Sequence, residues 1–361
     1  MIRCLVADDS RTFRAILRTV LARAPGVEVV AEAADGREAV QKVVALRPDV
    51  VTMDVRMPGM DGLAAIAEIM ERAPTPVIVV SAEAGPDRQR LAFEALALGA
   101  IEVLSKPRSD AAAFEHDAEA IRSAVRAVAG LKLVTRHRRG TPLPRPPPAA
   151  AASPRVKPDP GRPPPRDRAA PAATGASAVV VGVVGSTGAP PVIASMLKGL
   201  PAGFLAPVLV VQHIAAGFEA GLAQWLSSEG RRPVKVAEDG EPLRLGATYL
   251  ALEGRHLVVR SGILHLTDDP PIRGFRPSGT VLLDALAHEY GPAGAGVVLT
   301  GMGDDGADGL RAMRARGAAT AAQGPASSVV FGMPKVAIEA GGAAETVEAD
   351  DLAGWLRKVA R

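Results

Sequence analysis

The chain has 361 residues, of which 48% are hydrophobic and 22% are charged, and its formal net charge is +3. This length allows two domains with separate cores. No apolar run reaches the roughly 18 residues that a membrane span needs, and no long apolar segment precedes Asp8, so we expect neither membrane insertion nor a secretory signal. The lone cysteine, Cys4, has no disulfide partner within the chain, which favours a reducing compartment and hence a cytoplasmic protein.

Short apolar runs and amphipathic segments alternate over residues 1–128. The runs predict strands at Arg3–Ala7, Val27–Glu32, Val50–Met53, Val77–Ser81 and Ile101–Leu104. The other segments predict helices at Thr12–Ala24, Gly36–Leu46, Asp61–Glu71, Asp87–Leu98 and Ala111–Val128. Such alternation is typical of a parallel sheet covered by helices. We therefore predict an α/β domain of the (βα)5 type over residues 1–128.

Acidic and phosphate-binding side chains follow the strands of this domain. Asp8 and Asp9 follow the first strand, Asp54 follows the third, Ser81 closes the fourth, and Lys106 follows the fifth. The carboxyl ends of parallel strands meet at one edge of a sheet, so these side chains should lie together. The three carboxylates suit Mg²⁺, which in turn favours a phosphoryl group approaching Asp54, with Ser81 and Lys106 holding its oxygens. Ordinary loop solvation is the alternative, but it does not account for five such residues on four strands.

The same residues stand in motifs that resemble those of bacterial response-regulator receiver domains. The motifs are Leu5-Val6-Ala7-Asp8-Asp9-Ser10, Met53-Asp54-Val55-Arg56-Met57-Pro58-Gly59-Met60-Asp61-Gly62, Ser81-Ala82 and Ser105-Lys106-Pro107. The resemblance implies that a histidine kinase phosphorylates Asp54 while Asp8 and Asp9 serve Mg²⁺. The chain departs from the family at Val103, where an aromatic residue is usual. That departure concerns an aromatic rotamer switch and not the phosphorylation chemistry.

Residues 129–177 form a segment of another kind. Prolines recur through Thr135–Ser177, which excludes a helix or a central strand and is typical of a semi-rigid spacer. This stretch has nine Lys/Arg against two Asp/Glu, so it alone makes the chain basic. A solvated linker is the favoured interpretation, and an electrostatic contact with an acidic partner is the alternative. Because the basic residues are concentrated in the linker, we expect no nucleic-acid partner.

The alternation resumes over residues 178–361. Strands are predicted at Val179–Val184, Val208–Val211, Gly246–Leu252, His256–Arg260, Gly296–Thr300 and Ala318–Ala321. Helices are predicted at Val192–Leu200, Phe218–Glu229, Ser278–Tyr290 and Gly306–Arg316. Val-rich runs bounded by Gly and Pro are typical of strands buried on both faces. We therefore predict a second doubly wound, mainly parallel α/β domain.

Three strands of the second domain are followed by side chains suited to nucleophilic catalysis, namely Ser186, His213 and Asp305. A serine hydroxyl is a weak nucleophile unless a base takes its proton, and an aspartate can orient that base. The backbone around Met302, between two glycines, can approach the site and bind an oxyanion. The remaining histidines are less suitable, because they precede this domain or lie within strand-like or helix-like patterns: His116, His137, His256, His265 and His288.

Each element also allows a simpler interpretation. Gly182–Gly188 resembles a nucleotide-binding turn, but no acidic residue occurs between Ser186 and Phe218, where such a site needs one. His213 alone could be a structural histidine at a strand end. Gly303–Gly309 could be an acidic loop or a calcium loop, although it lacks the EF-hand spacing. Together the elements favour catalysis, and the order Ser, His, Asp excludes the α/β-hydrolases.

At these residues the chain resembles the chemotaxis protein-glutamate methylesterase family, CheB, over both domains. The matching segments are Gly185-Ser186-Thr187-Gly188, Val211-Gln212-His213, Phe275-Arg276-Pro277-Ser278 and Leu299-Thr300-Gly301-Met302-Gly303-Asp304-Asp305-Gly306. The resemblance implies Ser186 as nucleophile, His213 as base and Asp305 as its partner, with Thr187 and the Met302 backbone in support. It implies hydrolysis of γ-glutamyl methyl esters on chemoreceptors, often with glutamine deamidation. The esterase itself should need no cofactor.

Two departures from the family pattern are visible near the catalytic residues. The serine loop usually reads Gly-Ala-Ser-Thr-Gly-Gly, whereas this chain has Val184-Gly185-Ser186-Thr187-Gly188-Ala189. After Pro277-Ser278 the family usually has Val-Asp, whereas this chain has Gly279-Thr280. Both departures leave the triad intact and concern the shape of the loops around it.

The leading hypothesis is a phosphorylation-regulated receptor methylesterase, with chemoreceptors as substrate, a chemotaxis histidine kinase as phosphodonor, and a monomer as the expected state. One alternative is a receiver-controlled serine hydrolase that acts on another protein ester or amide outside chemotaxis. Another is a non-catalytic output module of the receiver, which the intact triad argues against. The simplest regulation is steric, with the unphosphorylated receiver packed across the crevice of Ser186, His213 and Asp305.

Overall fold

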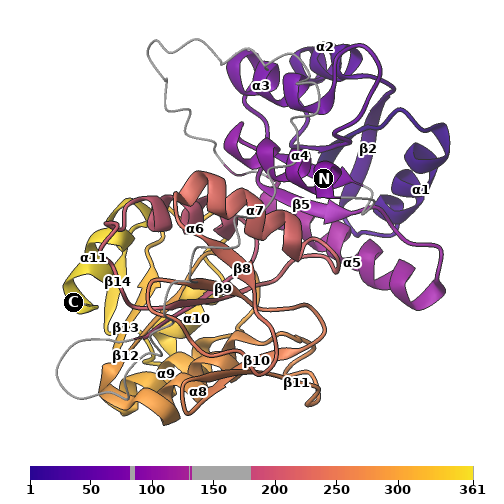
Figure 1. Cartoon of the computed structure of the whole chain (residues 1–361). Helices are drawn as coiled ribbons and strands as arrows, with labels where there is room; N and C mark the ends of the chain where they lie inside the picture. The colour runs from indigo at the N-terminus through magenta and orange to yellow at the C-terminus, as the bar shows by residue number, and fades with distance from the viewer. Residues whose placement is uncertain (82–85, 130, 132–179, 361) are drawn as a thin grey trace, which may run out of the picture.

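The computed structural model describes residues 1–81, 86–129, 131 and 180–360, and it shows two α/β lobes packed side by side (Figure 1). Apart from residues 129 and 131, the predicted linker (129–177) and the predicted boundary at residue 178 lie outside the described residues. They therefore stay predictions. None of the described helices is long and apolar enough to cross a membrane.

The N-terminal lobe is a five-stranded parallel sheet with the strand order β2-β1-β3-β4-β5. Its strands are β1 (Ile2–Ala7), β2 (Val27–Ala33), β3 (Val50–Met53), β4 (Val77–Ser81) and β5 (Glu102–Ser105). Its helices are α1 (Arg11–Ala22), α2 (Gly36–Leu46), α3 (Gly62–Arg72), α4 (Pro86–Ala97) and α5 (Ala111–Val128). The predicted (βα)5 order is confirmed, with element ends shifted by at most one or two residues.

Local sequence determines where most of these helices begin. Ser10, Asp35, Asp61 and Asp110 each stand directly before a helix and accept a backbone N–H from its first turn. Such caps satisfy donors that the helix itself leaves without partners. The helices therefore start immediately after the strand-end loops, and these loops hold the acidic cluster in place.

The C-terminal lobe is a seven-stranded parallel sheet with the order β14-β13-β12-β6-β7-β9-β8. Its strands are β6 (Val180–Gly185), β7 (Val208–Gln212), β8 (Val234–Val236), β9 (Thr248–Leu250), β12 (Gly294–Val298), β13 (Ala319–Gln323) and β14 (Glu345–Val347). Its helices are α6 (Ala189–Lys198), α7 (Glu219–Gly230), α8 (Gly279–Tyr290), α9 (Ala307–Ala315), α10 (Met333–Glu339) and α11 (Leu352–Val359), with 3₁₀ turns η1 (Gly291–Ala293) and η2 (Ala349–Asp351).

Strand β6 lies at the point where the strand order reverses. From β6 the chain adds β7, β9 and β8 on one side, and later β12, β13 and β14 on the other. Alternate side chains of β6 enter two different cores: Val183 packs in the cluster that contains Ile193 of α6, and Val184 in the cluster that contains Leu283 of α8. Helices therefore cover both faces, which confirms the doubly wound prediction, and the crevice of such a sheet lies beside β6.

One predicted strand belongs elsewhere. His256–Arg260 forms β10, which pairs antiparallel with β11 (Ile263–Thr267) in a separate two-stranded sheet. Ser261 and Gly262 both have positive φ, which a tight two-residue hairpin requires, so the chain turns back instead of crossing to the main sheet. The prediction that β10 continues the βα alternation is wrong for this reason. The elements β8, β11, β14, α10 and α11 were not predicted.

The lobes contact each other through α4 and β5 of the first and α7 and the β6–α6 turn of the second. Phe93 of α4 lies 6.1 Å from the ring of Phe218 and 6.2 Å from that of Trp225. These three side chains are almost wholly buried. Figure 1 shows α4 and β5 facing α7. The first lobe therefore covers the side of the second lobe on which Ser186 lies.

Candidate active site and phosphoacceptor pocket

The predicted catalytic side chains lie at one edge of the seven-stranded sheet. Ser186 follows β6, His213 follows β7, and Asp305 lies in the loop between β12 and α9. The His213 N–H donates to the carbonyl oxygen of Gly185 at 3.0 Å, and the Ser186 N–H donates to that of Thr300 at 3.1 Å. These bonds join the ends of three neighbouring strands, so residues far apart in sequence become adjacent.

His213 is held from two sides. Its Nε2 lies 2.9 Å from Asp305 Oδ2, and the ring of Phe275 stacks on the imidazole with a centroid distance of 4.3 Å and an interplanar angle of 8°. A carboxylate only accepts, so Nε2 donates the proton in this pair and Nδ1 presents its lone pair. Nδ1 is buried and has no hydrogen-bond partner among the described residues. Nδ1 is therefore the nitrogen that can act as a base.

Asp305 is buried at the N-terminus of α8. Its Oδ1 accepts from Ser278 Oγ at 2.7 Å and from the Thr280 N–H at 3.0 Å, and its Oδ2 also accepts from the Gly279 N–H at 2.6 Å. Burial alone would raise the pKa of Asp305, but the interactions with His213, Ser278 and Thr280 outweigh it and hold the pKa well below its usual range. The carboxylate therefore stays ionised and fixed in orientation.

Ser186 and the backbone of Met302 are brought together by a glycine. A Cβ atom at Gly301 would lie 2.6 Å from Ser186 Cβ and 2.4 Å from Met333 Sδ, so only glycine allows this approach. The N–H of Met302 makes no backbone hydrogen bond with the described residues. Among these residues no hydrogen bond joins Ser186 Oγ to His213. The site thus has a serine, a candidate base and a backbone N–H that can bind an oxyanion, and the serine hydroxyl is not hydrogen-bonded to the base.

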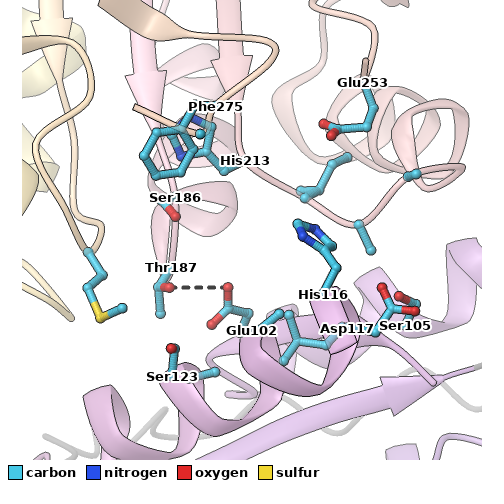
Figure 2. A pocket seen from close by; sticks show the side chains of 18 of the residues that line it. Glu102, Ser105, His116, Asp117, Ser123, Ser186, Thr187, His213, Glu253 and Phe275 are labelled. Atoms are coloured by element: carbon cyan, nitrogen blue, oxygen red, sulfur yellow. Dashed lines mark hydrogen bonds between the residues drawn. The ribbon is translucent and has the colours of Figure 1, made fainter. Parts of the chain in front are cut away.

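A cavity of about 340 Å³ opens in front of these groups, and both lobes line it. The second lobe provides Ser186, Thr187, His213, Phe275, Arg276 and Met302, and the first provides Glu102, Ser105, His116 and Asp117 among others. Figure 2 shows Ser186 beneath the stacked rings of His213 and Phe275, with side chains of the first lobe closing the space from the opposite side.

The side chain of Glu102, in the first lobe, contacts the candidate active site directly. The Thr187 hydroxyl donates to Glu102 Oε1 at 3.1 Å, the contact drawn as a dashed line in Figure 2. The second oxygen, Oε2, is buried and has no hydrogen-bond partner among the described residues. Burial raises the pKa of Glu102 to about 7, against the lowering effect of the bond from Thr187. A carboxyl group thus lies beside the residue that follows the candidate nucleophile.

The predicted acidic pocket forms at the carboxyl edge of the first sheet. Carboxylate oxygens of Asp8, Asp9 and Asp54 lie within 4.8 Å of one another. Lys106 Nζ lies 2.6 Å from Asp54 Oδ2 and 2.6 Å from Asp8 Oδ2, and Ser81 lines the same pocket. All five predicted residues therefore come together, and three carboxylates at this spacing fit a divalent cation with oxygen ligands.

Lys106 and the carboxylates influence each other's charge. Burial would lower the pKa of Lys106, but its bonds to Asp54 and Asp8 outweigh burial and raise it. Burial raises the pKa of Asp8, and Lys106 opposes that effect. The ammonium therefore stays charged and compensates the acidic cluster, in a position to contact a phosphoryl oxygen on Asp54.

Several residues of the site have roles that their sequence motifs do not reveal. Phe275 and Ser278 lie in a motif that was recognised, but only the structure shows the ring stacking on His213 and the hydroxyl bonding to Asp305. Gln212 Nε2 donates to the carbonyl oxygens of Ser186 and His213, at 2.9 and 3.0 Å. Its place in Val211-Gln212-His213 was the only available indication. Nothing in the sequence indicated a role for Glu102, because its partner Thr187 belongs to the other lobe.

Comparison with known proteins assigns both lobes. Residues 181–356 match the CheB methylesterase family, and residues 4–116 match the response regulator receiver domain. The catalytic-domain crystal structure of Thermotoga maritima CheB methylesterase aligns with 50% of this chain and 98% of its own length, at 35% identity and a TM-score of 0.49.

Two relatives are similar to this chain over its full length. The protein-glutamate methylesterase/protein-glutamine glutaminase 2 of Anaeromyxobacter dehalogenans is 44% identical over all of this chain and 97% of its own. The corresponding enzyme 4 of Myxococcus xanthus is also 44% identical, over 100% of this chain and 97% of its own. The chain therefore belongs to the CheB family of protein-glutamate methylesterases, with a response-regulator receiver domain at its N-terminus.

Proposed function

We propose that this chain hydrolyses γ-methyl esters of glutamate on chemoreceptors, with Ser186 as nucleophile, His213 as base and Asp305 as the group that orients His213. The supporting observation is the His213–Asp305 pair: the second imidazole nitrogen has no hydrogen-bond partner among the described residues, and His213 lines the same cavity as Ser186. The names of the two full-length relatives support the ester substrate and also suggest deamidation of glutamine side chains.

In the proposed reaction, His213 Nδ1 takes the hydroxyl proton of Ser186 as Oγ bonds to the ester carbonyl carbon. The developing oxyanion is bound by the Met302 N–H, and Thr187 lines the same cavity. The imidazolium, stabilised by Asp305, then gives its proton to the departing methoxide, and methanol leaves. Water deprotonated by His213 cleaves the acyl-serine and releases the glutamate carboxyl group and Ser186. An amide would react by the same steps with ammonia as leaving group.

Substitution of the triad tests this proposal. We expect Ser186→Ala and His213→Ala to abolish methanol release from methylated receptors, because triad members act as a unit. Asp305→Asn should leave a small residual rate, since the imidazole loses the carboxylate that fixes its tautomer. Ser195→Ala, an exposed serine on α6, serves as the control and should be unaffected. Near-normal methanol release by folded Ser186→Ala would refute the assignment.

We further propose that Asp54 accepts the phosphoryl group of a chemotaxis histidine kinase. Asp8, Asp9 and Asp54 would hold Mg²⁺, which offsets the charge of the approaching phosphoryl group, while Ser81 and Lys106 contact its oxygens. We expect Asp54→Ala to take no label from acetyl phosphate, and chelation of Mg²⁺ to prevent labelling of the unaltered chain. Label on Asp54→Ala, or undiminished label in chelator, would contradict this reading of the acidic pocket.

The contacts between the lobes support inhibition by the unphosphorylated receiver. Glu102 places a glutamate carboxyl group against Thr187, beside Ser186, and that group is chemically the same as the product of the proposed reaction. We infer that the receiver occupies the subsite of the glutamyl side chain as a product mimic. Phosphorylation at Asp54 would then relieve inhibition by withdrawing β5, which bears Glu102 at its start and is followed by Lys106.

We further propose that the protein is a monomer located in the cytoplasm. Cys4 is a free, buried thiol, and burial raises its pKa to about 12, so it is neither a reactive group nor half of a disulfide. This is consistent with a reducing compartment, in which a histidine kinase would also meet the receiver.

A further inference from the structure

One buried histidine has no part in the reaction proposed above. His256 on β10 is fully buried. Its Nε2 lies 3.2 Å from the carbonyl oxygen of Pro270, and its Nδ1 lies 3.2 Å from the backbone nitrogen of Ser278. The Ser278 nitrogen can only donate and the Pro270 oxygen can only accept. His256 is therefore neutral, with its proton on Nε2 and its lone pair on Nδ1.

Ser278 joins this histidine to the candidate triad. Its backbone N–H donates to His256, and its hydroxyl donates to Asp305 Oδ1 at 2.7 Å. Ser278 is also the N-cap of α8 and is itself fully buried. The next backbone N–H, that of Gly279, donates to Asp305 Oδ2. A continuous series of hydrogen bonds therefore runs from His256 through Ser278 to Asp305 and on to His213.

We propose that His256 and Ser278 are positioning residues that set the orientation of the Asp305 carboxylate toward His213, an inference that rests on the proposed function. Donors on Oδ1 and Oδ2 fix the plane of the carboxylate, so that Oδ2 faces His213 Nε2. His256 fixes the backbone of Ser278, which determines where both the hydroxyl and the Gly279 N–H point. Small errors in such an orientation reduce a catalytic rate much more than they reduce substrate binding.

His256 allows a matched pair of variants. An Asn side chain reaches about as far as Nδ1, so His256→Asn can keep the acceptor for the Ser278 N–H while losing the bond to Pro270. A Gln side chain reaches about as far as Nε2, so His256→Gln can keep the donor to Pro270 while losing the acceptor. We expect His256→Gln to lower kcat roughly tenfold or more with little change in KM, and His256→Asn to retain most of the activity.

Substitution of Ser278 provides a second, independent test. Ser278→Ala removes a donor to Asp305, which leaves more negative charge facing His213 and favours its protonated form. The acid limb of the pH–rate profile should therefore move to higher pH, kcat should fall by roughly ten- to hundredfold, and Ser278→Thr should restore both. Asp35→Ala is the control, because it removes the N-cap of α2 in the other lobe and should lower Tm without moving the profile.

All variants are measured in the full chain, activated with phosphodonor, by methanol release and by thermal unfolding. If Ser278→Ala and His256→Gln lower Tm but leave kcat and the acid limb unchanged, the two residues only stabilise α8 and the inference is wrong. Equal activity of His256→Asn and His256→Gln would also overturn it. Failure of the proposed function is distinguishable, because it would appear as activity retained by Ser186→Ala.

Discussion

A Cβ atom added at Gly279 would lie 2.2 Å from Val184 Cγ1, so position 279 accepts no side chain as long as Val184 is present. The family pattern has the opposite arrangement, with glycine at the position of Val184 and valine at that of Gly279. The differences at positions 184 and 279 are thus one exchange of volume between the end of β6 and the start of α8. In this chain the side chain of Val184 fills the space at position 279.

A second exchange lies on the other side of Ser186. A Cβ atom at Gly185 would lie 2.5 Å from the Cβ of Ala189. The family pattern has alanine at the first position and glycine at the second. The β6–α6 turn therefore keeps its close approach with the small residue moved from one side of the contact to the other. Neither departure alters the predicted triad.

The exchange at 184 and 279 predicts a strong coupling between two substitutions. Gly279→Val alone should destabilise the chain by about 3 kcal/mol or more, since it forces two valine side chains into one space. Val184→Gly alone should destabilise it through lost burial and added backbone freedom. The double variant should recover a large part of the loss and of the methanol release. Chemical denaturation of the four proteins measures this, and additive losses would contradict the exchange.

At the scale of elements, the site is assembled from the ends of β6, β7 and β12 and the start of α8. Each of the three strand ends is recognisable in the sequence, because a Val-rich run stops at a glycine or a polar residue, and Ser278 marks the start of α8 as its N-cap. The alternation of strands and helices along each domain was therefore sufficient to predict the two sheets. The polar residues that follow the strands then predicted the triad and the acidic pocket. Ser186, His213 and Asp305 needed no side-chain detail to be placed at one edge.

Other features could not be predicted, for physical reasons. The β10–β11 hairpin depends on positive φ at Ser261, a residue that rarely adopts it, so no turn was evident. The hydrogen bond from Gln212 to the carbonyl oxygen of Ser186 and the contact of Glu102 with Thr187 depend on side-chain geometry between elements that are distant in sequence. Contacts between the two lobes leave no periodic pattern in the sequence of either lobe.

Helices α4 and α7 provide a test of the contact between the lobes. Phe93 is buried against Phe218 and Trp225, so Phe93→Ala should weaken the closed arrangement more than it weakens either lobe's own core. We expect it to raise methanol release by the unphosphorylated chain several-fold and to reduce the further gain from phosphodonor.

The control for Phe93→Ala is Phe204→Ala, which removes a buried ring that lies beside Arg232 within the second lobe. This variant should lower Tm without activating the enzyme. If Phe93→Ala is no more active than the unaltered chain while its Tm falls, the α4–α7 contact stabilises the molecule without restraining the esterase.

At the scale of the whole molecule, β5 connects the two sites. Lys106 follows its carboxyl end and binds Asp54, while Glu102 at its start contacts Thr187 of the other lobe. Val103 follows Glu102 at the position where receivers usually have an aromatic residue. It is buried, and as a valine it has no aromatic ring that could change its rotamer. A displacement of β5 on phosphorylation would therefore reach the esterase through Glu102 without an aromatic switch.

The buried Glu102 makes the closed arrangement sensitive to pH. Burial raises its pKa from 4.5 to about 7, against the bond from Thr187. Below pH 4.5 the carboxyl group is protonated in both arrangements, so closure buries no charge. As the pH rises from 4.5 to about 7, the released carboxyl group ionises while the buried one stays protonated, and closure becomes steadily less favourable. Above that range the cost of closure no longer changes.

Glu102→Gln separates this effect from the titration of His213. The amide can accept from Thr187 but has no charge, so closure of this variant should not depend on pH through residue 102. The ratio of methanol release by the unphosphorylated unaltered chain to that by unphosphorylated Glu102→Gln should be near one below about pH 4, rise as the pH increases from 4.5 to about 7, and then level off. His213 is the same in both proteins, so its own titration cancels in the ratio. A ratio that stays constant over this range, or falls with rising pH, would show that Glu102 does not limit access to Ser186.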